Sequence, residues 1–573
     1  MRTEFCCAAH QGRRGALVQG VGSATRGRRN LMASAPAPWR ESRTLYSTPS
    51  LHPFWTAARP RAAAPWHWPL ALLAGLAQAA SLALPGSGAP QWWLQLASLL
   101  TLAWLVRPGT PWRRAAGLGW VFATTWLAGT FWWLFISMHT YGGLASPLAV
   151  AAVLGLAGFL ALYYAAALGI FSALAPSQRA LAALVFAALW LLAELARGVW
   201  WTGFPWGAGG YAHVEGPLAV LARSIGVYGI AAAAAALAML LAQWRPSDLR
   251  NLRAWALAAA VLVTLTALSW QRERAIAAPS LPATAPLTLA LLQGSIPQDE
   301  KFQPGSGVPM ALQWYSDQLR NATAQLVVAP ETAIALLPQQ LPPGYLQVIE
   351  DQYTRGAQAA LVGIPLGDLG LGYTNSVLGW KPGERAAYRY DKHHLVPFGE
   401  FIPPFFRWFT ELMNIPLGDF SRGALVQPPF VWRGERLAPN ICYEDLFGEE
   451  LGARFADPAN APTVFVNLSN IAWFGNSLAI DQHLQISRMR TLEFERPMVR
   501  ATNTGASAII DHQGQVTAHY EHGRRGVLTG SVQGRSGAPT PYGWWVARFG
   551  LWPLWLLGVA VVLAALLGRA RRD

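Results

Sequence analysis

Long apolar segments separated by short polar loops dominate the chain from residue 69 to residue 270. Each is about as long as the run of apolar residues that an α-helix needs to cross a bilayer. The segments are Pro69–Leu84, Gln91–Val106, Ala115–Phe135, Leu148–Leu174, Ala180–Ala196, Leu218–Ala242 and Leu252–Trp270, and an eighth, Phe549–Leu567, follows a long mixed region. This pattern predicts a seven-helix transmembrane domain at residues 66–272 and an eighth transmembrane helix at residues 549–568.

Residues 285–533 show a different pattern, in which short β-rich runs alternate with helical periodicity. The clearest helix is Ile480–Glu495. The predicted strands are Leu287–Leu292, Leu326–Ala329, Ala359–Ile364, Leu437–Ile441 and Thr463–Asn467. Strands that alternate with helices are typical of an α/β sheet, so we predict one α/β domain between the seventh and eighth spans.

Composition agrees with a membrane protein. Hydrophobic residues make up 53% of the chain, charged residues only 13%, and there are 28 Trp. This is too apolar and too poor in charge for a soluble protein of this length. Aromatic pairs at segment ends are expected at the level of the lipid headgroups. They are Trp66/Trp68, Trp132/Trp133, Trp200/Trp201 and Trp544/Trp545.

The net charge of +14 is spread in a way that predicts orientation rather than nucleic-acid binding. Basic residues lie in alternate loops and after the last span, whereas the loops at residues 85–90 and 137–146 carry no Asp, Glu, Lys or Arg. The residues concerned are Arg107, Arg113, Arg114, Arg179, Arg245, Arg250, Arg253, Arg569, Arg571 and Arg572. By the positive-inside rule, eight spans with both termini in the cytoplasm satisfy this distribution. The α/β domain then faces outward, which in a bacterium is the periplasm.

Residues 1–65 form a basic leader rich in Arg, Ser, Ala and Pro. A transit peptide, a disordered cytoplasmic tail and a mis-assigned start, with Met32 nearer the true one, all fit this composition. Within the spans, the i, i+3 spacing of Glu194 and Arg197 predicts an ion pair. Arg223 fits either a lipid-phosphate contact or an interfacial position.

Three motifs in the α/β domain place a chemically useful residue at the end of a short strand. Glu331 follows the run at residues 326–329, Lys392 follows a Tyr-Asp pair, and Cys442 follows the run at residues 437–441. The other two cysteines, Cys6 and Cys7, lie in the leader. A lone Cys at a strand end is either a nucleophile or a small core residue. A Glu, a Lys and a Cys in one α/β domain favour the nucleophile.

These motifs carry a resemblance to a known family. Pro-Glu-Thr at residues 330–332, Asp-Lys-His at 391–393, Pro-Phe-Gly-Glu at 397–400 and Cys-Tyr-Glu at 442–444 resemble the nitrilase superfamily, whose signature is a Glu–Lys–Cys triad. With the spans, Phe204-Pro-Trp206 and the segment at residues 470–475, the chain resembles the apolipoprotein N-acyltransferase family. The resemblance implies a multi-span α-helical membrane domain plus a nitrilase-like αββα sandwich in the periplasm.

The resemblance also implies an activity. An acyl chain would pass from a phospholipid, through a thioester on Cys442, to the α-amine of the N-terminal diacylglyceryl-cysteine of a lipoprotein, in the bacterial inner membrane. It implies no metal, no organic cofactor, no nucleic-acid partner and a monomer. Two alternatives stay open: a membrane-tethered amidase or nitrilase with water as acceptor, and a transporter or lipid-binding scaffold with a degenerate catalytic domain.

Acyl transfer assigns a role to each triad residue. A free thiol is only slightly ionised at neutral pH, so Cys442 needs a base, and Glu331 matches the motif position of that base. The carboxylate can serve if partial burial raises its pKa toward the working range. The ammonium of Lys392 can stabilise the oxyanion that forms on the substrate carbonyl.

Further residues follow from the family motif. Glu400 would position Lys392 or its substrate, or it caps its own loop, and Tyr443 and Glu444 would shape the pocket. Trp473 and Phe474 would line a lipid-facing lip, with core packing as the alternative, and His393 and His394 are interpreted as structural. The chain departs from the family at Ile471, where an Asp is usual, and at Phe302, where a Trp is expected and an indole N–H donor is lost.

Overall fold

The computed structural model describes residues 64–174, 178–277, 285–368, 370, 372–404, 406–410 and 420–570. These residues belong to one compact unit, Pro53–Asp573. The predicted leader lies outside the described residues except for its last two positions.

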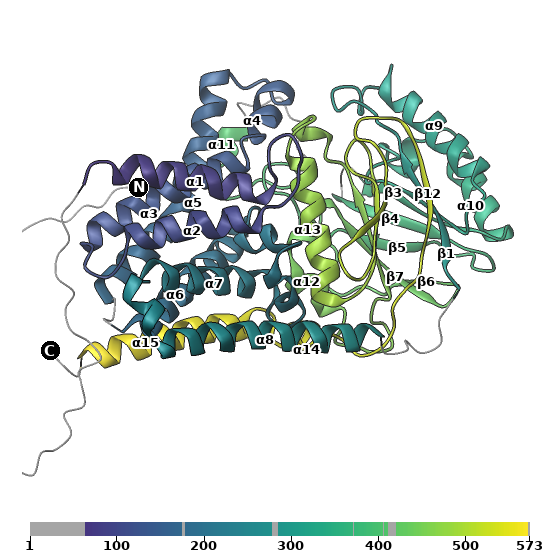
Figure 1. Ribbon diagram of the computed structural model, residues 1–573. Coiled ribbons are helices and arrows are strands. Elements are labelled where there is room, and N and C mark those ends of the chain that lie inside the picture. The colour runs from purple at the N-terminus through teal and green to yellow at the C-terminus, as the bar shows by residue number, and fades with distance from the viewer. Residues whose placement is uncertain are drawn as a thin grey trace, which may run out of the picture. The chain divides into compact units, whose positions relative to one another are not determined.

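Each predicted span coincides with a helix. These are α1 (His67–Leu82), α2 (Trp92–Leu105), α3 (Trp112–Thr130), α5 (Ser146–Leu174), α6 (Arg179–Val199), α7 (Ala222–Ala242), α8 (Leu252–Ala277) and α15 (Trp552–Ala570). Figure 1 shows most of them side by side at one end of this unit, with the sheets at the other, whereas α8 runs along the lower edge of the view toward the sheets. Among the described residues, four helical segments are long and apolar enough to cross a membrane, and a bent pair of helices, Trp112–Thr130 with Leu134–Tyr141, makes a fifth if it is one span. The four are Ser146–Leu174, Arg179–Thr202, Pro217–Ala242 and Trp552–Ala570. The chain is therefore a multi-pass membrane protein, whereas the division into eight spans stays a prediction.

The third predicted span is broken. Helix α3 ends at Thr130, and the chain bends by 62° into α4 (Leu134–Ile136) and η1 (Ser137–Tyr141). Trp133 lies in this bend and is only 1% exposed. The ring of Trp133 therefore packs inside the protein, against the α/β domain, rather than facing lipid, and its depth in the membrane stays a prediction.

The α/β domain contains two six-stranded mixed sheets. One has the order β12-β1-β2-β3-β4-β5 and the other β11-β10-β9-β8-β7-β6. The strands are β1 (Leu287–Gln293), β2 (Leu326–Ala329), β3 (Ala359–Asp368), β4 (Gly372–Trp380), β5 (Tyr388–Asp391), β6 (Phe430–Trp432), β7 (Glu435–Ile441), β8 (Val464–Ser469), β9 (Met498–Thr502), β10 (Ala508–Ile510), β11 (Val516–His519) and β12 (Gly526–Val532). The five predicted strands correspond to β1, β2, β3, β7 and β8.

The two sheets pack face to face, because Leu291 and Leu361 of one sheet share a buried cluster with Val466 of the other. Helices α9 (Gly307–Asn321) and α10 (Tyr345–Arg355) cover the first sheet. The second sheet is covered by α12 (Gly448–Ala453), α13 (Ala479–Phe494) and α14 (Pro541–Phe549). This arrangement is the αββα sandwich that the resemblance implies.

Helix α13 lies between the second sheet and the membrane helices (Figure 1). Fourteen of its sixteen residues are buried, although its sequence is rich in Gln, Arg and Glu. Buried polar groups of this kind need hydrogen-bond or ionic partners. Several of these partners belong to the bundle of predicted membrane helices, which is called the membrane half below. Arg223 at the start of α7 is one example, because its Nε donates to Glu495 at 2.8 Å. Arg223 thus joins the helical bundle to the α/β domain, a contact that the sequence did not indicate, and its position relative to the lipid surface stays a prediction.

Candidate active site

The three predicted triad residues lie where strands end. Glu331 follows β2, Lys392 follows β5 and Cys442 follows β7. Since β2 and β5 belong to one sheet and β7 to the other, the face-to-face packing of the sheets brings the three strand ends together. Lys392 Nζ lies 3.2 Å from Glu331 Oε1, and the charges of both groups act on the pKa of Cys442, as expected for side chains that lie close together.

Lys392 is fully buried between two carboxylates. Its Nζ donates to Glu331 Oε1 at 3.2 Å and to Glu400 Oε1 at 2.9 Å. Burial lowers the pKa of Lys392, but the charges of Glu331 and Glu400 outweigh it, so the pKa lies above its usual value. The side chain is therefore an ammonium, as stabilisation of an oxyanion requires.

Asn375 in β4 connects the same groups. Its side-chain Nδ2 donates to Glu331 Oε1 at 2.8 Å and to Glu400 Oε1 at 2.7 Å. Its backbone carbonyl accepts the backbone N–H of Lys392 at 2.8 Å. The second oxygen of Glu331 accepts the N–H of Asn470 at 2.7 Å, and that of Glu400 accepts the N–H of Val396 at 2.9 Å. Glu400 thus does both things considered for it: it caps its loop and it contacts Lys392.

Cys442 adopts a backbone conformation that is rare for residues other than glycine, with φ of 51°. Such a conformation costs on the order of 1–3 kcal/mol and is held by its surroundings. Here the Cys442 carbonyl accepts from His483 Nε2 at 3.2 Å and from Asn467 Nδ2 at 3.5 Å. A sharp turn between a strand and a helical segment also presents the nucleophile in other α/β enzymes.

The resting thiol of Cys442 is protonated. Burial and the charge of Glu331 raise its pKa to about 12, and Lys392 offsets only part of that shift. Attack by the sulfur therefore requires a base that removes the proton as the substrate is bound.

Glu444 fastens the nucleophile turn to the lysine loop. Its Oε1 accepts the backbone N–H groups of His393 at 2.7 Å and His394 at 3.2 Å. Its Oε2 accepts the N–H of Ile441 at 2.6 Å and the hydroxyl of Tyr390 at 2.8 Å. The carboxylate thereby holds the backbone next to Cys442 and the backbone next to Lys392 at a fixed separation. The sequence suggested only that Glu444 shapes the pocket.

Tyr443 and the predicted lip residues contact the membrane loops. The Tyr443 hydroxyl donates to the Gly203 carbonyl at 3.3 Å. Phe474 packs on Trp133 with ring centroids 4.2 Å apart, and Trp473 lies 6.0 Å from Tyr141. Phe474 therefore fits the packing alternative better than an open lip.

Phe302 is 42% exposed, as a substrate-contacting ring would be. The adjacent Lys301 is 2% exposed and was not singled out from the sequence. Its Nζ donates to the Glu331 carbonyl at 3.1 Å, and burial lowers its pKa to about 7 despite the charges of Glu331 and Cys442. The sequence could have pointed to Lys301, because this lysine lies in the turn region after β1 and directly precedes Phe302, an aromatic residue of the family motif.

The remaining polar residues have structural partners. His393 Nδ1 lies 2.8 Å from the Gly423 carbonyl, and His394 Nδ1 lies 2.8 Å from Glu450, with its ring stacked on Phe447. Among the described residues, no group of three His, Cys, Asp or Glu could hold a metal ion. Ile471, which replaces the usual Asp, is 2% exposed. The adjacent Asn470 accepts from Asn503 at 3.1 Å, so this loop is held without the Asp.

The loop at Phe204-Pro-Trp206 is anchored from within the bundle. Arg197 donates through Nη1 to the carbonyls of Phe204 at 2.6 Å and Trp206 at 2.8 Å. The predicted ion pair between Glu194 and Arg197 is confirmed, at 3.7 Å with both side chains fully buried. The pair is thus part of a scaffold that holds this loop against the catalytic domain.

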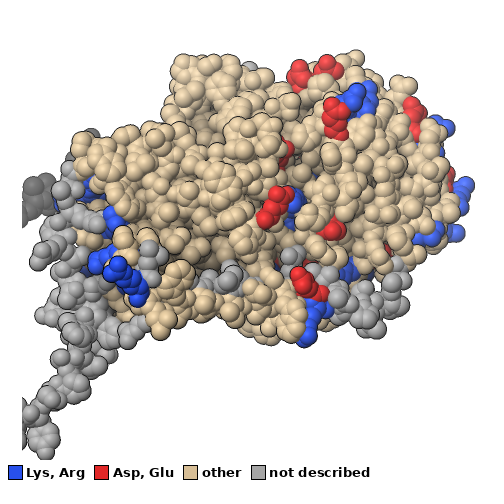
Figure 2. Space-filling model, in the orientation of Figure 1, with Lys and Arg blue, Asp and Glu red and all other residues tan. Residues whose placement is uncertain are grey.

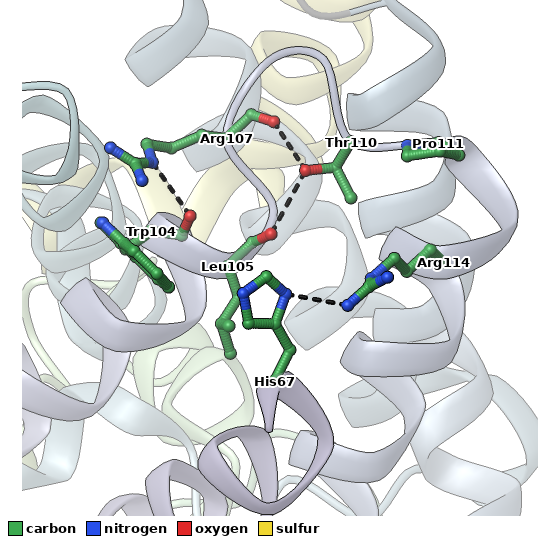
Figure 3. A pocket seen from close by; sticks show the side chains of 7 residues that line it. All are labelled: His67, Trp104, Leu105, Arg107, Thr110, Pro111 and Arg114. Carbon is green, nitrogen blue, oxygen red and sulfur yellow. Dashed lines mark hydrogen bonds between the residues drawn. The ribbon is translucent and has the colours of Figure 1, made fainter. Parts of the chain in front are cut away.

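A separate pocket of about 240 Å³ lies among α1, α2 and α3 (Figure 3). Its lining residues are His67, Trp104, Leu105, Arg107, Thr110, Pro111 and Arg114. Arg114 Nη2 lies 2.9 Å from His67 Nδ1, and Arg107 donates to the Trp104 carbonyl at 3.0 Å. None of the predicted site residues lines this pocket.

Comparison with known proteins identifies the family. The apolipoprotein N-acyltransferase N-terminal domain matches residues 71–240, and the carbon-nitrogen hydrolase domain matches residues 288–542. The chain is 66% identical over 501 residues to the apolipoprotein N-acyltransferase of Verminephrobacter eiseniae, with 85% of this chain and 94% of that protein covered. The chain belongs to the apolipoprotein N-acyltransferase family.

Other members of the family align over nearly their whole length. The enzyme of Ralstonia nicotianae is 46% identical, with 84% of this chain and 90% of that protein covered. The enzyme of Bordetella bronchiseptica is 42% identical, with 89% of this chain and 98% of that protein covered. As a member of the apolipoprotein N-acyltransferase family, the chain is an enzyme with the activity for which the family is named. The roles of the individual site residues stay predictions.

Proposed function

We propose that this N-acyltransferase works by two displacements through a thioester on Cys442. The donor is a phospholipid, and the acceptor is the α-amine of the N-terminal diacylglyceryl-cysteine of an apolipoprotein. The observation that supports this most is the joining of a strained, protonated Cys442 with Glu331 and with the ammonium of Lys392 in one buried site.

In the first displacement, Glu331 accepts the thiol proton and the Cys442 sulfur attacks the ester carbonyl of the phospholipid. The oxyanion that forms is stabilised by Lys392, and a donor of this kind is typically worth about 2.7–4 kcal/mol. Collapse breaks the ester C–O bond. The proton on Glu331 passes to the departing alkoxide, which leaves a lysophospholipid and an acyl-Cys442 thioester.

In the second displacement, the neutral α-amine of the acceptor attacks the thioester carbonyl. Glu331 takes a proton from the attacking nitrogen, Lys392 again faces the oxyanion, and the C–S bond breaks. The thiolate regains a proton, and the product is an amide. Glu400 keeps Lys392 in place in both steps, and Phe302 and Trp473 offer apolar rings to the acyl chains.

We further propose that the protein lies in the bacterial inner membrane, with residues 285–533 in the periplasm, both termini cytoplasmic and one copy per functional unit. Figure 2 supports this orientation. Lys and Arg gather at the end of the helical bundle that lies away from the sheets, and the visible face of the bundle between that end and the sheets is nearly free of charged residues. A fluorescent-protein fusion after residue 573 should fluoresce, because that reporter folds in the cytoplasm; a dark but intact fusion would reverse the orientation.

The amidase alternative uses the same triad with water as acceptor, and the family assignment favours transfer. Purified enzyme should transfer acyl chains from a defined phospholipid to a synthetic diacylated lipopeptide, and should not hydrolyse soluble amides in detergent without phospholipid. Cys442→Ser should fold normally, with an unchanged thermal midpoint, and lose transfer. Full transfer by Cys442→Ser would remove Cys442 from the mechanism, and rapid amide hydrolysis would favour the amidase.

A further inference from the structure

Two consecutive residues of α13 connect the membrane bundle to the nucleophile. Gln482 faces the membrane helices and His483 faces the Cys442 turn, and both are buried, at 4% and 1% exposed. Neither residue stood out in the sequence.

Gln482 is held by three groups from the membrane half. Its Oε1 accepts the indole N–H of Trp133 at 3.1 Å and that of Trp206 at 2.8 Å. Its Nε2 donates to the carbonyl of Thr130, the last residue of α3, at 2.9 Å. The bend after α3 and the Phe204-Pro-Trp206 loop therefore meet at one side-chain amide, whose donor and acceptor are both used.

His483 is held as firmly from the other side. Its Nδ1 lies 3.1 Å from the Arg500 guanidinium, which can only donate, so Nδ1 accepts and Nε2 carries the proton. That proton is donated to the Cys442 carbonyl at 3.2 Å. Burial and the charge of Arg500 keep the pKa of His483 well below its usual value, so the ring stays neutral. With both nitrogens occupied, His483 is not a candidate base.

The contact to the Cys442 carbonyl matters because the nucleophile adopts a positive φ. A strained backbone persists only where its surroundings hold it, and a displacement of about 1 Å at a reacting atom can cost roughly 100-fold in rate. The ring of Trp206 also lies 5.6 Å from that of His483, so the same membrane residue touches both members of the pair.

We propose that Gln482 and His483 are positioning residues that make the geometry of Cys442 depend on the membrane bundle, through the two indoles of Trp133 and Trp206. The inference rests on the proposed acylation of Cys442. It adds a reason why the catalytic domain and the spans form one unit: the bundle holds the backbone of Cys442 in position, and it also delivers the lipid substrates.

The test is the single-turnover rate of acyl loading, followed by intact mass after mixing purified enzyme with a saturating defined phospholipid. Gln482→Leu replaces the amide by a branched apolar side chain that is one bond shorter, and it leaves both indoles without their acceptor. This variant should load about 10- to 100-fold more slowly, and the phospholipid concentration that gives the half-maximal rate should stay unchanged. Gln482→Glu keeps the oxygen acceptor for both indoles, and its carboxyl donates to the Thr130 carbonyl when it is protonated, so this variant should recover most of the rate.

Gln485→Leu is the matched control. Gln485 lies on the same helix, is 5% exposed, and donates to the Gly88 carbonyl of another membrane loop at 3.3 Å. It does not contact Trp133 or Trp206, and its variant should load within about twofold of wild type, a rate change under about 0.5 kcal/mol. Trp133→Phe and Trp206→Phe each remove one indole N–H but keep a ring, and they replace Gln482→Leu if that variant does not fold.

Each result is decisive. A folded Gln482→Leu that loads at the wild-type rate overturns the inference and leaves the thioester mechanism intact. Equal slowing in Gln485→Leu overturns it too, since any damage to the interface would then suffice. If wild-type enzyme transfers acyl chains without ever loading Cys442, the thioester mechanism and this inference fail together.

Discussion

The side chain of Lys301 donates to the backbone carbonyl of Glu331 at 3.1 Å. Glu331, the proposed base, is thus held at its carbonyl by one lysine and at its carboxylate by another, Lys392. The pKa values of the two lysines are shifted in opposite directions. Lys392 has two carboxylate partners, whereas burial lowers the pKa of Lys301 to about 7.

Lys301 should give the protein a pH-dependent stability. Between its folded pKa of about 7 and an unfolded value near about 10.4, the unfolded chain binds a proton that the folded chain lacks. This contribution to stability therefore falls as pH is lowered from about 10 to about 7. Lys301→Met should raise the thermal midpoint relative to wild type most at pH 7 and least at pH 10. Lys381→Met, which removes a lysine paired with Glu384 at 2.9 Å, is the control, and an equal pH trend in both variants would contradict this assignment.

Removal of Lys392 should cost stability as well as activity. Lys392→Met leaves Glu331 and Glu400 facing each other without their cation, which should destabilise the fold by about 3–5 kcal/mol. Adding Glu400→Gln removes one of these charges and should restore much of the stability, while transfer stays absent. Chemical unfolding and a transfer assay on the same preparations separate the two effects. Restored transfer in the double variant would show that Lys392 is needed only for folding.

Glu444→Gln should loosen the connection between the nucleophile turn and the lysine loop. The carboxylate accepts four hydrogen bonds, and an amide cannot accept at its nitrogen. Loss of a hydrogen bond to a charged group costs about 1.5–3 kcal/mol. Glu384→Gln, at an exposed site, should change the unfolding free energy by less than about 0.5 kcal/mol. Equal stability of the two variants would contradict the role given to Glu444.

The thiol of Cys442 should be unreactive at rest. With a pKa of about 12, its alkylation by iodoacetamide in the absence of lipid should rise steadily from pH 7 to pH 10 without a plateau. Because the charge of Glu331 helps to raise that pKa, Glu331→Gln should alkylate faster at each pH and yet fail to load an acyl chain. Slower alkylation in Glu331→Gln would mean that the carboxylate activates the resting thiol.

Much of the fold followed from the sequence. Apolar length located the spans, and runs such as Leu326–Ala329 located central strands, because these segments are buried on both faces and read as continuous apolar stretches. Seven of the strands in the described residues were not predicted. In β4, one of these, the polar residues Thr374, Asn375 and Ser376 interrupt the apolar pattern. The break after Thr130 was missed because an apolar run continues through it.

The site was predicted as far as motifs reach. Glu331, Lys392 and Cys442 sit in short signatures, so their positions at strand ends could be anticipated. Asn375, Lys301 and His483 act through contacts between segments far apart in the chain, and a sequence alone does not show which segments meet. The burial of Trp133 was not anticipated for the same reason, because its partner, Gln482, lies 349 residues away.

In the proposed mechanism, Cys442 carries the acyl chain between donor and acceptor. The most direct measurement is intact-mass analysis of the purified enzyme after incubation with one defined phospholipid, followed by addition of a diacylated lipopeptide. The account predicts a gain of one acyl mass on the peptide that contains Cys442, which disappears as acylated lipopeptide forms. Transfer at full rate with no acyl mass on that peptide at any time would contradict it.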